Sequence, residues 1–101
     1  MLNIQSNAFV YILTNYSRST LYVGVSSKLK EKITDHKNGL GSEFCIKYNC
    51  DQLVFIKDFD SLIEAIVFEK TLKRWRRNWK EELIESINPK WTDLSYDILA
   101  Q

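Results

Sequence analysis

The chain has few of the residues that build metal centres from sulfur and imidazole. It contains one histidine and two cysteines, Cys45 and Cys50, and their spacing does not match that of zinc ligands. The composition therefore argues against a zinc site of the Cys/His type. We expect both cysteines to be reduced thiols that are partly buried.

The chain also lacks long apolar runs. No stretch approaches the ~20 apolar residues that a membrane-spanning helix needs. The N-terminal sequence MLNIQSNAF has no basic region followed by an apolar stretch, which argues against a secretion signal. These absences predict a cytoplasmic protein. No repeat, linker or low-complexity tract is visible, and 101 residues with 45% hydrophobic content predict a single domain, 1–101, with one core.

A strong net charge is missing as well, because the formal charge is only +1. The charges are unevenly distributed, however. The segment from Glu69 to Lys80 carries six basic residues and one acidic residue. Such a local basic patch is compatible with a nucleic-acid partner, and it is equally compatible with a solvated helix face.

The sequence between Phe9 and Val25 predicts a β-hairpin. Two runs rich in β-branched and aromatic residues flank the polar connector NYSRS, whose side chains favour a turn. A turn centred between Tyr16 and Ser17 places Tyr11 opposite Tyr22 on one face of the sheet. Gly24 follows two positions later and permits a close approach to the backbone. The two phenols are either ordinary packing or the floor of a site.

The segment after the hairpin predicts a helix with an apolar stripe formed by Leu29 and Ile33. Lys32 and His36 are four residues apart, so both emerge on the same face of this helix. They are either a solvated helix edge or part of a site. A short irregular or single-turn segment, SEFCIKYNC, leads to a third strand at Leu53–Phe59.

A second helix begins near Asp60 or Ser61, where Glu64 completes a capping box. At 100° per residue, Glu69 points into the apolar arc of this helix. A buried carboxylate needs a partner, because an isolated buried charge costs several kcal/mol. The partner is either a structural cation, Lys73 or Arg76, or a metal ion and substrate.

A third helix is expected at about Asn78 to Ile87, with Trp79, Leu83 and Ile87 on its buried side. The proline in INPKW ends it. Thr92 is a candidate cap for a last short helix, DLSYDIL.

At this point the ordered motifs resemble the GIY-YIG endonuclease superfamily, in particular its small single-domain bacterial members. The sequences FVY and YVG stand at the GIY and YIG positions, and the likeness continues through LKEKITDHKNGL, KYN, EAIVFEKTLKRWRR and LIESINPKWTDL. It covers residues 8–95. The resemblance implies an α+β fold, a three-stranded antiparallel sheet flanked by helices in the order β-β-α-β-α-α. That order agrees with the elements expected from the residues.

The resemblance also implies roles for individual residues. Tyr11 and Tyr22 match the tyrosines that position or deprotonate the attacking water. Glu69 matches the carboxylate that holds one Mg²⁺ or Mn²⁺ ion. The residues that match other positions at or near the site are Lys32, in the place of an arginine that steadies the scissile phosphate, His36, Asn88 and the motif glycine Gly24.

Two departures from the family pattern bear on activity. Phe9 replaces the first motif glycine, which a strand tolerates. Lys32 replaces the catalytic arginine, so the charge is kept but the planar fork that matches a phosphate is lost. Lys28 and Lys30 are alternative cations on the same helix.

The sequence thus predicts a divalent-metal-dependent endonuclease that cuts DNA, with RNA as the less favoured substrate, acting as a monomer or weak homodimer. The alternatives are a nucleic-acid-binding module that has lost turnover through the lysine change, and a protein-interaction role. Trp75 and Trp79 have the spacing of core residues, with base stacking as the alternative. The expected phosphate-binding surface consists of Lys73, Arg74, Arg76, Arg77 and Lys80.

Overall fold

The computed structural model describes residues 2–3 and 5–101 and is built around one antiparallel sheet. Strand β1 (Ala8–Thr14) lies in the middle, with β2 (Leu21–Ser26) on one side and β3 (Gln52–Phe59) on the other. Its seven residues are all buried. This burial explains its nearly continuous apolar sequence, because both faces of the strand are covered.

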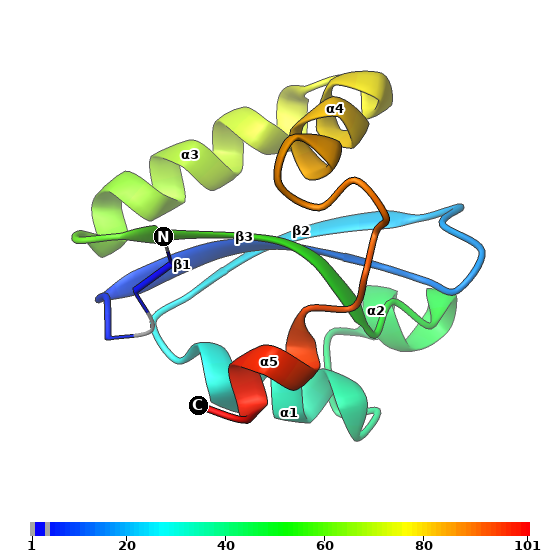
Figure 1. Ribbon diagram of the computed structural model, residues 1–101, viewed down its shortest axis with the longest axis horizontal. Helices are drawn as coiled ribbons and strands as arrows, with labels where there is room; N and C mark the ends of the chain where they lie inside the picture. Colours follow the sequence, from blue (N-terminus) through cyan, green and yellow to red (C-terminus); the bar gives the residue numbers. More distant parts are fainter. Residues whose placement is uncertain (1, 4) are drawn as a thin grey trace.

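Helices cover both faces of the sheet (Figure 1). The helices α3 and α4 pack on one face, and α1, α2 and α5 lie on the other. The predicted α+β class and order are confirmed, and the expected last short helix is α5. The segment that was expected to be irregular or a single turn contains the short helix α2. The bounds are α1 (Leu29–Lys37), α2 (Glu43–Tyr48), α3 (Leu62–Arg74), α4 (Arg77–Ile87) and α5 (Ser95–Leu99).

The alternation along β1 divides the core into two clusters. Val10 and Ile12 point towards α3 and α4, whereas Phe9, Tyr11 and Leu13 point towards α1 and α5. Both clusters are fully buried, as expected when successive side chains of a strand face opposite sides of a sheet. Tyr11 is therefore part of the layer beneath the sheet that contains α1.

The hairpin turn is centred one residue later than predicted, so the partner of each β1 residue lies two positions further along β2. Tyr11 is opposite Gly24, and Tyr22 is opposite Leu13, so the tyrosines are diagonal neighbours and not a direct pair. The physical reason is the longer turn between Thr14 and Leu21. There Arg18 adopts a φ of 61°. Period-two alternation still leaves both tyrosines on one face.

The buried side of α4 also differs from the prediction. Ile84 is the residue that this helix buries, whereas Trp79 and Ile87 are 48% and 55% exposed. The chain is extended at Trp75, with a ψ of 148°, so α4 starts in a new direction after α3. Trp75 packs against the core as expected. The prediction of core packing is wrong for Trp79.

The capping predictions gave a mixed result. Ser61 caps α3 and accepts from the Glu64 N–H at 3.4 Å, as predicted. Thr92 does not cap α5. Instead, the Asp93 carboxylate accepts from Ser95 and from the Leu53 N–H at 3.0 Å. It also pairs with Lys37 at 2.5 Å, so one carboxylate joins α5, β3 and α1.

Three further features complete the fold. Cys45 and Cys50 are buried free thiols, as predicted, and burial raises the pKa of the Cys50 thiol to about 11.

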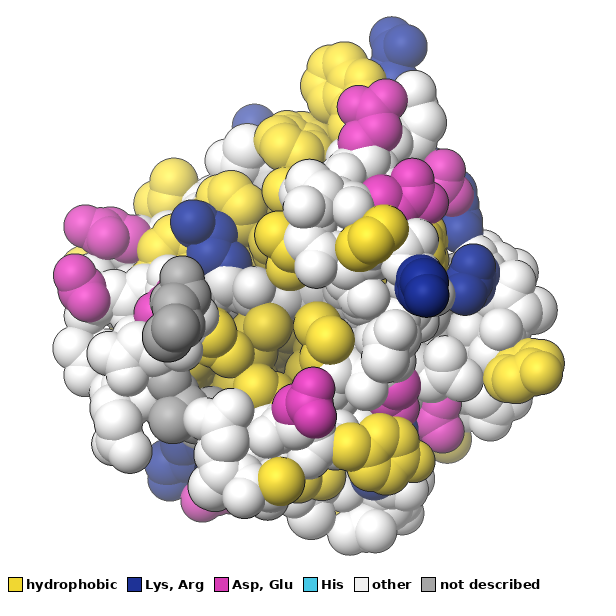
Figure 2. Space-filling view, in the orientation of Figure 1, with side chains coloured by type: hydrophobic (Ala, Val, Ile, Leu, Met, Phe, Trp, Pro, Cys, Tyr) yellow, Lys and Arg dark blue, Asp and Glu magenta, His cyan; other side chains and the backbone are white. Residues whose placement is uncertain are grey.

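Figure 2 shows an apolar hollow in front of β3, between α4 above and α5 below, and Ile56, Leu83 and Ile87 contribute to it. Within residues 2–3 and 5–101, no helix has the length and apolarity to cross a membrane.

Candidate active site

A cavity of about 270 Å³ opens beside β2, at the sheet edge opposite β3. Four of the residues predicted from sequence meet in its wall, although they come from three different elements. β1 and β2 each contribute a tyrosine, and α1 contributes a lysine and a histidine. The loop from α1 to α2 closes the remaining side. The lining residues are Tyr11, Tyr22, Lys32, Asp35, His36, Leu40, Gly41 and Ser42.

Gly24 allows the Tyr11 ring to lie directly over β2. A Cβ atom at position 24 would come within 2.5 Å of the Tyr11 Cζ and 2.6 Å of its hydroxyl oxygen. Such a contact is far below van der Waals separation, so only glycine accommodates the ring there. The group that lies close to the Gly24 backbone is therefore the Tyr11 ring.

The Tyr11 phenol is held in its neutral form. The side chain is 4% exposed, and burial raises its pKa above the usual value. The charges of Tyr22, Cys45 and Glu69 act in the same direction. A neutral phenol donates a hydrogen bond, and a nearby cation or metal ion is needed to favour the phenolate.

His36 stands between the two tyrosines. Its ring centroid is 6.3 Å from that of Tyr11 and 6.2 Å from that of Tyr22. Burial lowers its pKa, and the Lys32 charge lowers it further, while Asp35 acts in the opposite direction. The imidazole is therefore neutral near pH 7 and can accept a proton.

The Nδ1 atom of His36 is buried and has no hydrogen-bond partner among the described residues. Gly41 presses against this atom, since a Cβ at that position would lie 2.2 Å from it. A buried, unpaired ring nitrogen costs free energy, and such groups collect at functional sites. His36 is thus partly buried against the loop that follows α1 and is not a fully solvated residue.

Lys32 is the lysine on α1 that faces the cavity. Its side chain is exposed, and it forms no ion pair within residues 2–3 and 5–101. Lys28 and Lys30 line a separate hollow at the start of α1. Of these three lysines, Lys32 is thus the one available to an anion in the cavity.

Glu69 approaches from α3, on the other face of the sheet. The residue is 9% exposed, and its carboxylate pairs with the Lys73 ammonium at 2.8 Å. Lys73, one of the two structural cations that the sequence analysis considered, is therefore the partner of the Glu69 carboxylate. Glu69 does not line the cavity, but its charge helps to raise the pKa of Tyr11, so the two groups interact electrostatically.

The Glu69 carboxylate supplies oxygen atoms of the kind that a hard divalent cation prefers. The described residues contain no group of three or more His, Cys, Asp or Glu side chains arranged for a metal, so Glu69 would be a single carboxylate ligand. Mg²⁺ is commonly held by one or two carboxylates and retains several waters. Its positive charge would take over the pairing that Lys73 now provides to Glu69.

Asn88 has a structural role in this arrangement. Its amide donates to the Val54 carbonyl at 3.0 Å and to the Thr92 carbonyl at 2.8 Å, and its oxygen accepts from the Thr92 N–H at 3.0 Å. The side chain does not line the cavity. It fastens the end of α4 to β3.

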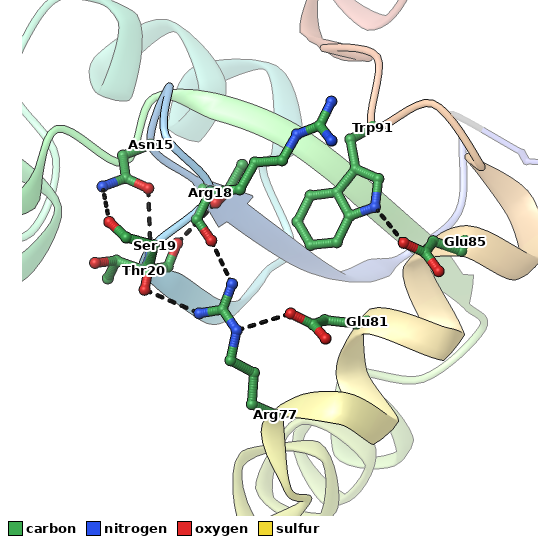
Figure 3. Close-up of polar contacts among 9 residues, drawn as sticks. Asn15, Arg18, Ser19, Thr20, Arg77, Glu81, Glu85 and Trp91 are labelled. Carbon is green, nitrogen blue, oxygen red and sulfur yellow. Dashed lines mark hydrogen bonds and ion pairs between the residues drawn. The ribbon is translucent and has the colours of Figure 1, made fainter.

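The predicted phosphate-binding surface is partly occupied by internal contacts. Arg77 donates to the carbonyls of Arg18 and Ser19 and pairs with Glu81 at 2.8 Å (Figure 3). Arg76 lies over the Trp79 ring, 5.9 Å from its centroid. The structure thus assigns Arg77 to holding the hairpin turn against α4.

A second set of contacts holds the same turn. The Arg18 guanidinium lies 5.3 Å from the centre of the Trp91 ring and donates to the Lys90 carbonyl at 3.0 Å. The Trp91 indole N–H donates to Glu85 at 2.9 Å (Figure 3). The hairpin that carries both tyrosines is therefore fixed at its tip.

Sequence reasoning missed the loop that closes the cavity. Leu40, Gly41 and Ser42 of this loop line the cavity, and so does Asp35 of α1. Asp35 and Leu40 lie within the motif LKEKITDHKNGL but were given no role, and Gly41 and Ser42 lie beyond that motif. The two glycines of the NGLGS segment were the available signal. One of them, Gly39, has a φ of 73°, which reverses the chain after α1.

Comparisons with known proteins are consistent with this geometry. A family profile described as the GIY-YIG catalytic domain matches residues 7–82. A UPF0213 protein of Clostridium perfringens is 35% identical over 77% of this chain and 83% of its own length. UPF0213 proteins of Staphylococcus saprophyticus and Haloquadratum walsbyi are 30% and 29% identical, over 75% and 76% of this chain and 92% and 85% of their own. No solved structure matches the chain.

Proposed function

The chain belongs to the family of GIY-YIG catalytic domains, and from this premise we propose that it is an endonuclease that hydrolyses phosphodiester bonds in DNA with a divalent metal ion. Membership implies a nuclease-type activity on nucleic acid. The observation that carries the finer proposal is the cavity in which Tyr11, Tyr22, Lys32 and His36 converge.

Water activation is assigned to the phenols and the imidazole. Tyr11 is buried and neutral, and the same cavity holds a neutral His36 whose Nδ1 atom has no partner in the described part of the chain. In our proposal a tyrosine hydroxyl orients the attacking water. His36 accepts the proton that the water loses as its oxygen bonds to phosphorus. The ester P–O bond on the opposite side of the phosphorus then breaks, and the departing oxygen takes a proton from solvent.

We assign to Lys32 the stabilisation of the negative charge that develops on the phosphate. Hydrolysis concentrates negative charge on the non-bridging oxygens, and a cation already in place stabilises that charge without reorganisation. Lys32 is exposed, faces the cavity and has no ion pair within the described ranges. Lysine offers a point charge here, whereas arginine would offer two parallel hydrogen bonds.

Glu69 is the proposed metal ligand. When bound, Mg²⁺ or Mn²⁺ supplies Lewis-acid charge to a phosphate oxygen and favours ionisation of a nearby water or phenol. Burial of the carboxylate and its electrostatic effect on Tyr11 support this role. Lys73 neutralises the carboxylate in the absence of a metal ion.

We assign contacts with the phosphates of the DNA backbone to two basic side chains, Arg74 and Lys80. Arg74 is exposed. Lys80 is partly buried and makes one long hydrogen bond, to the Lys73 carbonyl at 3.5 Å, and it lines a hollow of about 260 Å³ together with Ser19 and Thr20 of the hairpin turn. Such side chains neutralise phosphates without reading sequence. Arg77 is removed from the predicted contact set, because its guanidinium is already bound to the turn.

A second candidate function is a nucleic-acid-binding module without turnover. Two lysines favour it. Lys32 stands where the resemblance implies an arginine, and Lys73 already forms an ion pair with the Glu69 carboxylate. In that case the cavity binds a phosphate but does not activate water. Binding without cleavage distinguishes it from the first proposal.

The two functions are separated by a cleavage assay. Supercoiled, branched and single-stranded DNA are incubated with the protein and Mg²⁺ or Mn²⁺, with EDTA as the metal-free arm. We expect metal-dependent cleavage of at least one substrate, abolished by Glu69→Gln and retained by Glu64→Gln, an exposed carboxylate on the same helix. Binding of all substrates without cleavage of any would favour the binding module.

A further inference from the structure

A row of aromatic rings leads out of the cavity along α2. The Tyr22 ring, which lines the cavity, lies 5.8 Å from the Phe44 ring, and Phe44 lies 4.8 Å from Tyr48. The Lys47 ammonium stands 5.3 Å from the centre of the Tyr48 ring. We call Tyr22, Phe44 and Tyr48 the aromatic row. None of the roles assigned to the cavity explains its two outer members.

The outer rings are exposed although the helix has a core to bury them in. Phe44 is 43% exposed and Tyr48 is 41% exposed, whereas Cys45 on the same helix is 4% exposed. Leaving large apolar rings in water forfeits the stabilisation that burial would give. Contiguous exposed apolar groups, bordered here by a cation, mark a binding surface.

We propose that the aromatic row binds unpaired nucleobases of the strand whose phosphate lies in the cavity. This inference rests on the proposed function, because it assigns the surface next to the same site. Every nucleobase has a π face that stacks on Phe or Tyr rings, and such stacking tolerates any sequence. Phe44 and Tyr48 are therefore positioning residues for the substrate strand.

The charge and the continuity of the surface favour a nucleic-acid strand as the occupant. The row starts at Tyr22, a residue of the cavity, and Phe44 lies next to it, so the row extends the cavity wall towards α2. Lys47 adds a positive charge beside the outermost ring, where a phosphate of the same strand would lie. In a duplex the bases already stack on each other and offer no free face, which makes unpaired bases the preferred ligand.

The test measures binding separately from cleavage. Fluorescence anisotropy in EDTA compares a labelled oligothymidylate of roughly 12 nucleotides, a length typical of single-strand sites, with an abasic oligomer of equal length and with a blunt duplex. We expect the oligothymidylate to bind about 100-fold more tightly than the abasic chain, since stacking contributes about tenfold per base and the row has two outer rings. Phe44→Ala and Tyr48→Ala should each reduce this difference about tenfold.

Matched variants separate stacking from general effects. Phe44→Leu keeps the apolar bulk but should lose as much of the preference as Phe44→Ala, and Phe44→Trp should keep it and show indole quenching on binding. Tyr16→Ala removes a 90% exposed ring from the hairpin turn and should change nothing. Equal binding of bases and abasic chain by the wild type, or an unchanged preference in Phe44→Ala, would overturn the inference.

The inference and the proposed function can fail independently. Base-dependent binding that requires Phe44, without cleavage of any DNA, would support the aromatic row and contradict the endonuclease. Cleavage that is equal on paired and unpaired DNA and is insensitive to Phe44→Ala would support the endonuclease and contradict the aromatic row.

Discussion

Lys32 stands where the resemblance to the family implies an arginine. Its ammonium can approach a phosphate but cannot bind two of its oxygens in parallel. We therefore expect Lys32→Arg to increase the single-turnover cleavage rate, and Lys32→Ala to lower it by about 100-fold, the effect of removing one transition-state donor. Lys30→Ala is the matched control, because that side chain lines a different hollow. A rate unaffected by Lys32→Ala would exclude this lysine from the site.

Gly24 tests the packing of Tyr11. Gly24→Ala places a Cβ within 2.5 Å of the ring, and we expect a loss of about 1–3 kcal/mol in the free energy of unfolding. Urea denaturation measures this loss. In a Tyr11→Ala background the same change should be nearly neutral, because the ring is gone. A double-mutant cycle with no coupling would contradict the contact.

His36 gives a pH-dependent prediction. Burial and the Lys32 charge lower its pKa in the folded protein, so the unfolded chain binds more protons as the pH falls through 6.5, the ordinary histidine value. The free energy of unfolding should therefore decrease as the pH falls from that value towards the lower folded pKa.

NMR checks this pH prediction directly, because the chain has one histidine and its ring signals need no assignment. We expect a titration midpoint below 6.5, raised in Lys32→Met by removal of the neighbouring charge and lowered in Asp35→Asn. A wild-type midpoint at or above 6.5 would contradict the buried neutral imidazole.

At the scale of elements, the hairpin and α4 are coupled through Arg77. Arg77→Ala removes two hydrogen bonds to turn carbonyls and the Glu81 ion pair, so we expect a loss of about 1–3 kcal/mol in stability. Arg74→Ala should leave stability unchanged, and it should weaken DNA binding and reduce its salt dependence. Thermal unfolding and anisotropy titrations measure the two effects.

The opposite pattern would contradict these assignments. A stable Arg77→Ala protein with weak DNA binding would return Arg77 to the phosphate-binding surface. An Arg74→Ala protein with unchanged affinity and unchanged salt dependence would remove Arg74 from it.

The elements were largely predictable because their signals are local. Ser61 and Glu64 specify the start of α3, and β-branched runs specify the strands. The hairpin register was not predictable from the tyrosines, because it depends on a turn in which Arg18 adopts a left-handed conformation. The buried side of α4 depends on the extended residue Trp75, which a helical wheel ignores.

At the scale of the whole molecule, the site that we propose draws on both faces of the sheet. Lys32 and His36 come from α1 beneath it, and Glu69 comes from α3 above it (Figure 1). The family motifs supplied these residues from sequence, but not the loop around Gly41, whose role depends on contact with His36. The residues that close the cavity come together only in the folded chain, so no local sequence pattern predicts it.

The central claim is that this assembly hydrolyses DNA through Tyr11 and a metal held by Glu69. The most direct test is the single-turnover cleavage rate of wild type, Tyr11→Phe and Glu69→Gln across a Mg²⁺ titration. We expect wild-type cleavage to saturate with Mg²⁺, and both variants to be slower by about 100-fold or more while remaining folded. Wild-type cleavage in EDTA, or a Tyr11→Phe rate equal to that of the wild type, would contradict the claim.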